Sequence, residues 1–409
     1  MRSALARGRC QYAPMLSLCL RRARPHLALA CLTASLLAGC GGDAASTVPA
    51  AATPAEPVTP RVVVLSAAEQ ARIPEVLAER RGNDFSRSVV IKDNARVLLS
   101  LAETSSEPGV VVAALRALLT TWTHSPRYAE RMQPITPEYT TVVLRRMSDE
   151  HPGVQAAAMK AATKCLLGET PNAEIAAKLI DLATRHPSAA GRHEALEALW
   201  RASAIASTPA QIAPFVAALD APEAWLVSSA LFRLGAFGAG WPEQPTLRAK
   251  LRALLAHADP GVRGRAAAAL STIVGASDPQ RDELAQAILP LLRDPHAYPR
   301  SAAATALAWL DHRPAVHAIV TLLDDRSDNT YDLRGYTLLD GTPGFVHHDG
   351  SPWSRVSDAA LRALQSFSSR LGERFTFDVH HERVDIDLGV AAEAARAWYQ
   401  RVRADLPPP

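Results

Sequence analysis

Aromatic residues are scarce in this chain of 409 residues: Trp, Tyr and Phe make up 5%, although 48% of the residues are hydrophobic. Strands favour aromatic and β-branched residues, so this scarcity argues against a β-sandwich or a β-barrel. The apolar content is carried mainly by Ala and Leu and is interrupted by 30 prolines. This combination is typical of many short helices with sharp ends.

Cysteine is almost absent beyond the first 40 residues. Cys10, Cys19, Cys31 and Cys40 lie in that stretch, and only Cys165 follows it. The region after residue 40 therefore cannot form an internal disulfide. Cys165 lies in an apolar, Ala-rich stretch, which predicts a buried and unreactive thiol.

Motifs of catalysis are also missing. The sequence contains no G-x-S-x-G, no phosphate-binding glycine loop and no C-x-x-C. Two His-rich stretches, His347–Asp349 and His380–Glu382, lack the ligand spacing of known zinc sites. We therefore expect no enzymatic activity, no cofactor and no metal, with the histidines solvated in loops.

Positive charge is concentrated at the start of the chain. Residues 1–39 hold six arginines and no acidic residue, and without them 38 basic residues face 41 acidic ones. No Lys/Arg-rich run follows Arg24, so the basic footprint that nucleic-acid binding needs is missing. We expect no nucleic-acid partner.

The first 40 residues read as an export signal. Arg21, Arg22 and Arg24 precede an apolar run from Leu27 to Leu37, which is too short to span a bilayer but suits a signal-peptide core. The run ends in Leu-Ala-Gly-Cys at residues 37–40, which resembles the lipobox of bacterial lipoproteins. The resemblance implies cleavage before Cys40 and lipidation of its thiol. Translation could begin at Met1 or at Met15.

The segment that follows, residues 41–61, reads as a tether. It contains four prolines and mostly small residues, so it cannot bury a core of its own. In related lipoproteins, the residue after the lipidated cysteine guides sorting between membranes. By that resemblance, Gly41 points to the outer membrane, with the folded part facing the periplasm.

A short pattern recurs along the rest of the chain. In "DPGVRGRAAAAL", Asp259 and Pro260 suit a helix start, and apolar residues follow Arg263 at three, four, six and seven positions, on one helix face. The same offsets recur from six other residues, which are Val111, Gln155, Arg192, Val227, Arg300 and Ser357. Each copy follows a proline, and most copies are 35 to 44 residues apart, the period of a helical-repeat solenoid.

The Asp-Pro turn, the Val262-Arg263 pair and the Ala-rich helix face resemble HEAT repeats, in particular the class first associated with phycobilin lyases. The resemblance spans about residues 87–370. It implies an all-α fold, a right-handed α-α superhelix of about seven helical hairpins. It does not imply a lyase, because no site motif carries over.

The ends of the solenoid differ from its repeats. The stretch 66–81 predicts a solvent-tolerant helix, and 389–406 predicts a closing helix with Trp398 and Tyr399 packed on the last repeat. Between them, 375–388 alternates apolar and polar residues. The predicted domains are a signal peptide (1–39), the lipidated tether (40–61), a solenoid (62–372) and a C-terminal cap (373–409).

The last repeat contains an insertion, residues 324–353, between its two helices. Insertions in solenoids map to one face and often bind a partner. Candidate partner-binding residues in it are Tyr331, Arg334, Tyr336, Phe345, His347 and Trp353, which we expect to be exposed. The alternative is that the insertion covers the end of the solenoid as a cap.

Three functions remain open. The first is a membrane-anchored scaffold or adaptor that binds proteins in the cell envelope. The second is an accessory subunit or metal-dependent enzyme that uses the His-rich C-terminal loops. The third is a structural spacer of the envelope. The sequence names no partner and no small-molecule substrate.

Overall fold

The structure is a computed structural model that describes residues 63–85, 94–120, 135–167, 171–203, 209–237, 245–274, 278–330, 336–344, 355–373, 375 and 388–408. Contacts divide the chain into two units, Met1–Pro60 with Asp349–Pro352 and Arg61–His348 with Trp353–Pro409. Every described residue belongs to the second unit.

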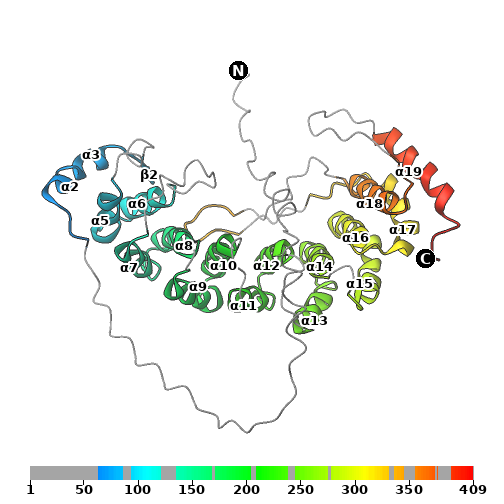
Figure 1. Ribbon diagram of the computed structural model, residues 1–409, viewed down its shortest axis with the longest axis horizontal. Helices are drawn as coiled ribbons and strands as arrows, with labels where there is room; N and C mark the ends of the chain where they lie inside the picture. The colour runs from blue at the N-terminus through cyan, green and yellow to red at the C-terminus, as the bar shows by residue number, and fades with distance from the viewer. Residues whose placement is uncertain are drawn as a thin grey trace, which may run out of the picture. The chain divides into compact units, whose positions relative to one another are not determined.

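The copies of the sequence pattern form the inner row of helices in this unit (Figure 1). Each helix begins at its predicted proline or within four residues after it. The row consists of α6 (Pro108–Thr120), α8 (Pro152–Leu166), α10 (Ala189–Ser203), α12 (Ala224–Phe237), α14 (Pro260–Ile273), α16 (Ala297–Trp309) and α18 (Val356–Arg370).

A second row of helices lies behind the first and alternates with it along the chain. Its members are α5 (Ala95–Thr104), α7 (Pro137–Arg146), α9 (Ala173–Arg185), α11 (Pro209–Ala218), α13 (Pro245–Leu254), α15 (Arg281–Ile288) and α17 (Val316–Thr321). Short 3₁₀ turns extend α15 (η4, Leu289–Arg293) and flank α17 (η5, Arg313–Ala315; η6, Leu322–Asp324). The predicted all-α repeat solenoid is confirmed.

The Asp-Pro turn starts a helix as its chemistry predicts. The backbone N–H of Val262 donates to the Asp259 carboxylate at 2.9 Å, and Pro260 occupies the first turn, where no N–H is needed. In other repeats, different side chains cap the helix in the same way. His151 accepts from Val154 N–H before α8, and Asn172 accepts from Ile175 N–H before α9.

The apolar positions of the pattern form the core between helices. All of them are at most 4% exposed apart from Arg233, which replaces an apolar residue in α12 and is 9% exposed. Small residues bring the inner helices close together. At Gly264 of α14, an added Cβ would lie 2.5 Å from the ring of Tyr298 on α16. Larger side chains at such contacts would force the helices apart.

The arginine at the head of several copies joins one repeat to the next. Arg263 donates to both carboxylate oxygens of Asp294 at 2.8 and 2.9 Å, and also to the carbonyls of His257 and Ala258 in its own turn. Arg192 binds Glu223 through one nitrogen, and Arg300 binds one oxygen of Asp325 through two nitrogens. Each also donates to two carbonyls of its own turn, as Arg263 does. The Val-Arg signal is therefore an inter-repeat clamp, in which a bidentate fork suits a carboxylate.

The prediction of a single N-terminal helix over 66–81 is wrong in its extent. Two short helices, α2 (Ala67–Ala71) and α3 (Ile73–Ala78), replace it, because Pro74 starts a new helix and cannot continue the previous one. Strands β1 (Arg80–Arg81) and β2 (Asp84–Phe85) then pair antiparallel around Gly82, whose φ is +61°. Gly suits this left-handed turn because it has no Cβ.

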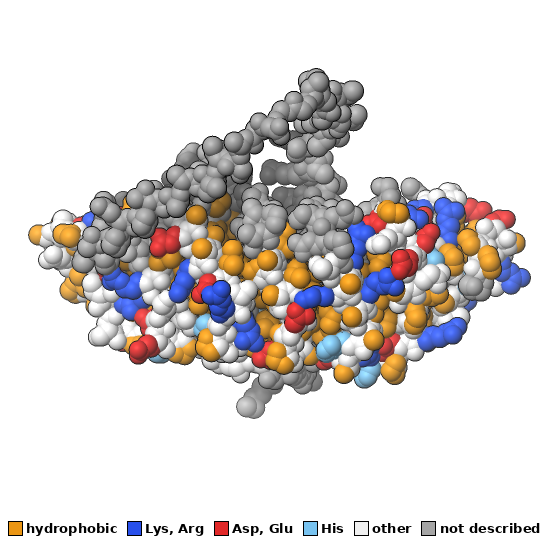
Figure 2. Space-filling view, turned by 90° about the horizontal axis from the view of Figure 1, so that it is seen from below, with side chains coloured by type: hydrophobic (Ala, Val, Ile, Leu, Met, Phe, Trp, Pro, Cys, Tyr) orange, Lys and Arg blue, Asp and Glu red, His pale blue; other side chains and the backbone are white. Residues whose placement is uncertain are grey.

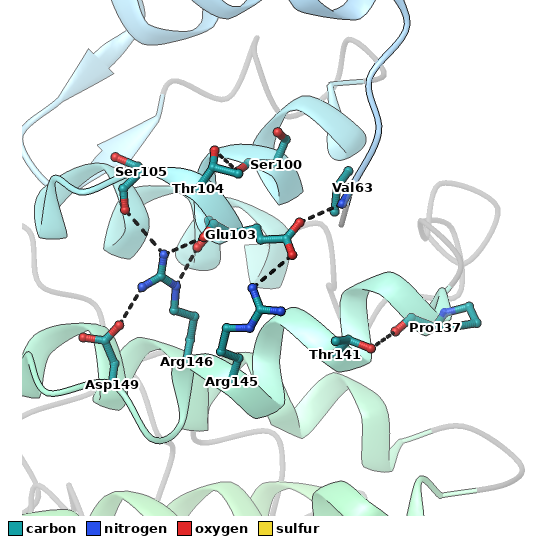
Figure 3. A network of polar contacts seen from close by, with 11 residues as sticks. Val63, Ser100, Glu103, Thr104, Ser105, Pro137, Thr141, Arg145, Arg146 and Asp149 are labelled. Atoms are coloured by element: carbon teal, nitrogen blue, oxygen red, sulfur yellow. Dashed lines mark hydrogen bonds and ion pairs between the residues drawn. The ribbon is translucent and has the colours of Figure 1, made fainter. Parts of the chain in front are cut away.

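A polar network fixes the first described residue to the first repeats (Figure 3). The buried Glu103 carboxylate accepts from the Val63 N–H at 2.7 Å and pairs with Arg145 of α7 at 3.1 Å. Arg146 donates to the carbonyls of Ala102 and Glu103, which end α5. These bonds join α5, α7 and the start of the described chain.

The closing helix is α19 (Leu388–Val402). Trp398 is fully buried, with its ring 5.6 Å from that of Phe375, and the Tyr399 hydroxyl lies 2.9 Å from His317 Nδ1 on α17. Both residues therefore pack on the last repeat, as predicted. The alternating stretch 376–387 lies outside the described residues.

Candidate functional site

Most of the candidate residues from the sequence lie outside the described residues. These are Cys40, Tyr331, Arg334, Phe345, His347 and Trp353, together with His348, His380 and His381. Tyr336 is described. Within the described ranges, no cluster of His, Cys, Asp or Glu could hold a metal ion. No helix among these residues has the length and apolar character needed to cross a membrane.

Residues 336–344, the second of the two described parts of the insertion, form a tight hairpin. Thr337 pairs with Pro343, and the N–H of Gly344 donates to the Tyr336 carbonyl at 3.1 Å. At its tip, Gly341 has a φ of +82°, and Asp340 accepts from the N–H and hydroxyl of Thr342. These bonds hold Tyr336 and Asp340 at fixed positions on one compact turn.

The hairpin lies over the inner row, far from the helices that flank it in the sequence (Figure 1). Its Tyr336 ring stacks on Trp225 of α12, with the ring centres 4.3 Å apart and the planes 9° apart. The ring of His193 on α10 lies edge-on to both, 5.5 Å from Trp225 and 6.1 Å from Tyr336. Tyr336 is only 6% exposed, so the expectation that it is an exposed aromatic is wrong.

The carboxylate of Asp340 points to two cations on the first repeats. Arg116 of α6 lies 3.6 Å from its Oδ2, and Lys160 of α8 lies 3.7 Å from the same atom. Burial by itself would raise the pKa of Asp340, but the bonds from Thr342 and the charges of Lys160 and Arg116 outweigh it and lower the pKa. The insertion of the last repeat thus contacts the inner helices of the first four repeats.

Beneath the hairpin, the inner helices carry a polar network of their own. Arg233 of α12 donates to Ser229 Oγ at 2.6 Å and pairs with Glu197 of α10. Ser229 Oγ lies 3.0 Å from Nδ1 of His193, and Lys160 lies 3.4 Å from Glu194. These bonds link α8, α10 and α12 to one another without any group from the hairpin.

Burial shifts the pKa of several of these groups. It lowers the pKa of His193 well below its usual value, and the charges of Arg233 and Lys160 add to this, so the imidazole is neutral at pH 7. Burial raises the pKa of Glu194, which Lys160 opposes. It also lowers the pKa of Arg233 to about 10 and raises that of Tyr336 to about 12. We call Arg116, Lys160, His193, Glu194, Trp225 and Arg233 the inner-face site.

The sequence analysis missed the inner-face site, although the repeat register contains a signal for it. Counted from the residue that heads each copy, the positions two before, two after and five after carry four of its six side chains, whereas His193 and Arg233 lie one and six positions after. Trp225 and Tyr298 hold the first position, Glu194 and Arg265 the second, and Arg116 and Lys160 the third. Aromatic or charged residues at these positions, in an otherwise Ala-rich helix, mark the face.

The same face continues onto α14 and α16. The guanidinium of Arg265 lies over the rings of Phe232 and Tyr298, 4.6 and 5.8 Å from their centres. The face formed by the outer row of helices looks different: in Figure 2, basic and acidic side chains are interspersed among apolar ones. Ion pairs connect neighbouring members of the outer row: Lys250 of α13 pairs with Asp220, just after α11, and Arg252 of α13 pairs with Glu283 of α15.

Cys165 lies apart from the inner-face site. It is 3% exposed within α8, and burial raises the pKa of its thiol to about 11. The predicted burial of this cysteine is confirmed, and a raised pKa is the direction expected for a poor nucleophile.

No known protein family matches the chain, and no curated protein matches it in sequence. Among solved structures, Kap121p bound to Pho4p is similar over 84% of this chain and 37% of its own, with 14% identity and a TM-score of 0.49. The chain thus spans about a third of this karyopherin. An engineered protein (17% identity, TM-score 0.36) covers 82% of this chain and 96% of its own. Human deoxyhypusine hydroxylase (17% identity, TM-score 0.27) covers 77% and 98%.

Proposed function

We propose that this protein is a lipid-anchored scaffold of the bacterial cell envelope that binds a polypeptide partner on its inner helices. The observation that carries the binding role is the inner-face site, which already accommodates a folded polypeptide segment, the hairpin 336–344. An aromatic ring, buried polar groups and cations gathered on one face are the usual composition of a protein-binding surface. The proposal includes no enzymatic activity and no cofactor.

The binding role predicts a specific loss on mutation. With the full chain in detergent as bait, a distinct set of envelope proteins should be captured, and Trp225→Ala should reduce that capture. Trp309→Ala is the matched control, because Trp309 ends α16 and is 58% exposed, away from the site. Capture that is unchanged by Trp225→Ala, or lost equally with Trp309→Ala, contradicts the binding role.

The anchor is supported by sequence alone: the lipobox-like residues 37–40 after an apolar run of signal length, followed by a proline-rich tether. We place the protein at the outer membrane, facing the periplasm, from Gly41. Cys40→Ser should move the protein from the membrane fraction to the soluble fraction or leave an unprocessed precursor. If mass spectrometry shows a mature protein that does not begin at Cys40 and carries no acyl groups, the proposed anchor is contradicted.

A further inference from the structure

We propose that the hairpin 336–344 is an exchangeable internal ligand, and that the inner-face site takes in its place a partner segment with an aromatic ring and a nearby carboxylate. This inference rests on the proposed binding role of the inner helices and names the chemistry of the partner. It also gives the insertion a function, since the chain carries its own occupant of the site.

The first support is that the solenoid does not need the hairpin. The polar groups beneath it are joined to one another: Arg233 to Ser229 and Glu197, Ser229 to His193, and Lys160 to Glu194. A buried polar group that lost its only partner would be costly, but these keep theirs when the hairpin leaves. The hairpin supplies none of these bonds.

The second support is the sparse attachment of the hairpin. Its described polar contacts with the inner helices are the two ion pairs of Asp340, and its apolar contacts are the stacked ring of Tyr336 and the partly buried Leu339, which packs against the core. Those ion pairs are longer than a hydrogen bond, at 3.6 and 3.7 Å, and the Arg116 and Lys160 side chains are 34% and 30% exposed. Partly exposed pairs of this length hold weakly.

The charge of the surface indicates what would replace the hairpin. Four cations, Arg116, Lys160, Arg233 and, further along, Arg265, outnumber three carboxylates, those of Glu194, Glu197 and Asp84, the last 4.0 Å from Arg116. A partner that brings a carboxylate toward Arg116 and Lys160 restores the balance that Asp340 provides. An aromatic side chain would take the place of Tyr336 on Trp225, where stacking favours a flat ring. The partner segment is therefore acidic and aromatic.

The hairpin itself supplies the probe. The bond from Gly344 N–H to the Tyr336 carbonyl brings the two ends together, so a head-to-tail cyclic peptide of YTLLDGTPG with a Gly-Gly link keeps its turn. Binding of a fluorescent version to the full chain in detergent can be followed by anisotropy. In the wild-type chain, the tethered hairpin competes at a high effective concentration.

Variants that loosen the internal hairpin should open the site. Tyr336→Ala should bind the peptide at least tenfold more tightly than the wild-type chain. Gly344→Ala should act in the same direction, because an added Cβ would lie 1.9 Å from the Tyr336 ring. Gly235→Ala is the matched control, since its Cβ would meet only ordinary contacts from 3.5 Å, and it should bind like wild type.

Two further arms test the chemistry. Trp225→Ala added to Tyr336→Ala should abolish peptide binding. A peptide with Asn in place of Asp340 should bind several-fold more weakly, and this difference should vanish when Arg116→Gln and Lys160→Gln are added to Tyr336→Ala.

Equal peptide affinity for the wild type and both hairpin variants overturns the proposal. So does the absence of peptide binding to Tyr336→Ala and Gly344→Ala, because the hairpin would then be a permanent part of the fold. The two proposals fail separately. Peptide exchange without capture of any envelope protein removes the proposed function, whereas Trp225-dependent capture without peptide exchange removes the internal ligand.

Discussion

The ring of Tyr336 in the insertion of the last repeat lies parallel to that of Trp225 in α12, with the ring centres 4.3 Å apart. The insertion therefore does not project from the end of the solenoid as a free loop. Its described hairpin lies on inner helices of the first four repeats, so this part of the insertion is neither an exposed loop nor a cap over the end of the solenoid.

The stacked pair should be energetically coupled. In a double-mutant cycle, Trp225→Ala and Tyr336→Ala should each destabilise the chain, and the double variant should lose less than the sum. Stacked aromatic pairs give a coupling of about 0.5–1.5 kcal/mol beyond the area they bury. Urea unfolding of the four proteins measures it. A coupling of zero would mean that the two rings do not meet in solution.

Because the inner helices pack closely, two glycine-to-alanine substitutions should change the stability of the protein in opposite directions. Alanine is favoured over glycine within helices by up to about 1 kcal/mol, so Gly235→Ala should leave stability unchanged or raised. Gly264→Ala should lower stability by about 1–3 kcal/mol, because the new Cβ would lie 2.5 Å from the Tyr298 ring.

The cause can be checked by combining Gly264→Ala with Tyr298→Ala. Removing the ring should relieve the clash, so Tyr298→Ala should cost less in that background than in the wild type. If Gly264→Ala is as stable as Gly235→Ala, as judged by the melting temperature, the contact between α14 and α16 is looser than the structure shows.

The clamp between Arg263 and Asp294 predicts a loss of stability that depends on pH. Their side chains are 12% and 6% exposed, so Arg263→Ala should cost about 2–4 kcal/mol at neutral pH. Arg263→Lys keeps the charge but loses the bidentate fork, so its stability should lie between those of the wild type and Arg263→Ala.

The sign of the pH effect follows from Asp294. Burial would raise its pKa, but the bonds from Arg263 and from the N–H of His296 outweigh this and lower it. The stabilisation is therefore complete above the unfolded value, about pH 4, and is lost as the pH falls through the lower folded value. The free energy that Arg263→Ala removes should shrink between pH 5 and pH 2.5. A constant difference would show that the pair is not ionised as described.

Local pattern was enough to predict the repeats but not the site. The offsets from Arg263 predicted which side chains are buried, because a helix face follows directly from spacing. The partner of Arg263 could not be predicted, since Asp294 belongs to the next repeat and only the stacking of repeats brings it near. The contact of Tyr336 with Trp225 is harder still: no periodicity connects an insertion to a helix three repeats earlier. Likewise, Pro74 divides the first helix that its apolar spacing suggested, and the end of that helix is replaced by the strand pair that turns at Gly82.

The final prediction concerns His193, which should make the protein less stable in mild acid. Arg233 donates to Ser229 Oγ, so the hydroxyl hydrogen is free to donate to Nδ1 of His193, an arrangement that requires a neutral ring. Burial, with the charges of Arg233 and Lys160, lowers the folded pKa well below the unfolded value of about 6.5. Below that pH the unfolded chain binds a proton that the folded chain does not, so stability should fall as the pH falls, by up to about 1.4 kcal/mol per unit.

His193→Gln should remove this part of the slope of stability against pH between pH 6.5 and pH 5, whatever its effect on stability at pH 7.5. His312, whose pKa burial also lowers, contributes in the same direction, and His312→Gln is the companion variant. Urea unfolding at several pH values measures both, and a slope unchanged by His193→Gln would mean that the ring can take up a proton in the folded protein.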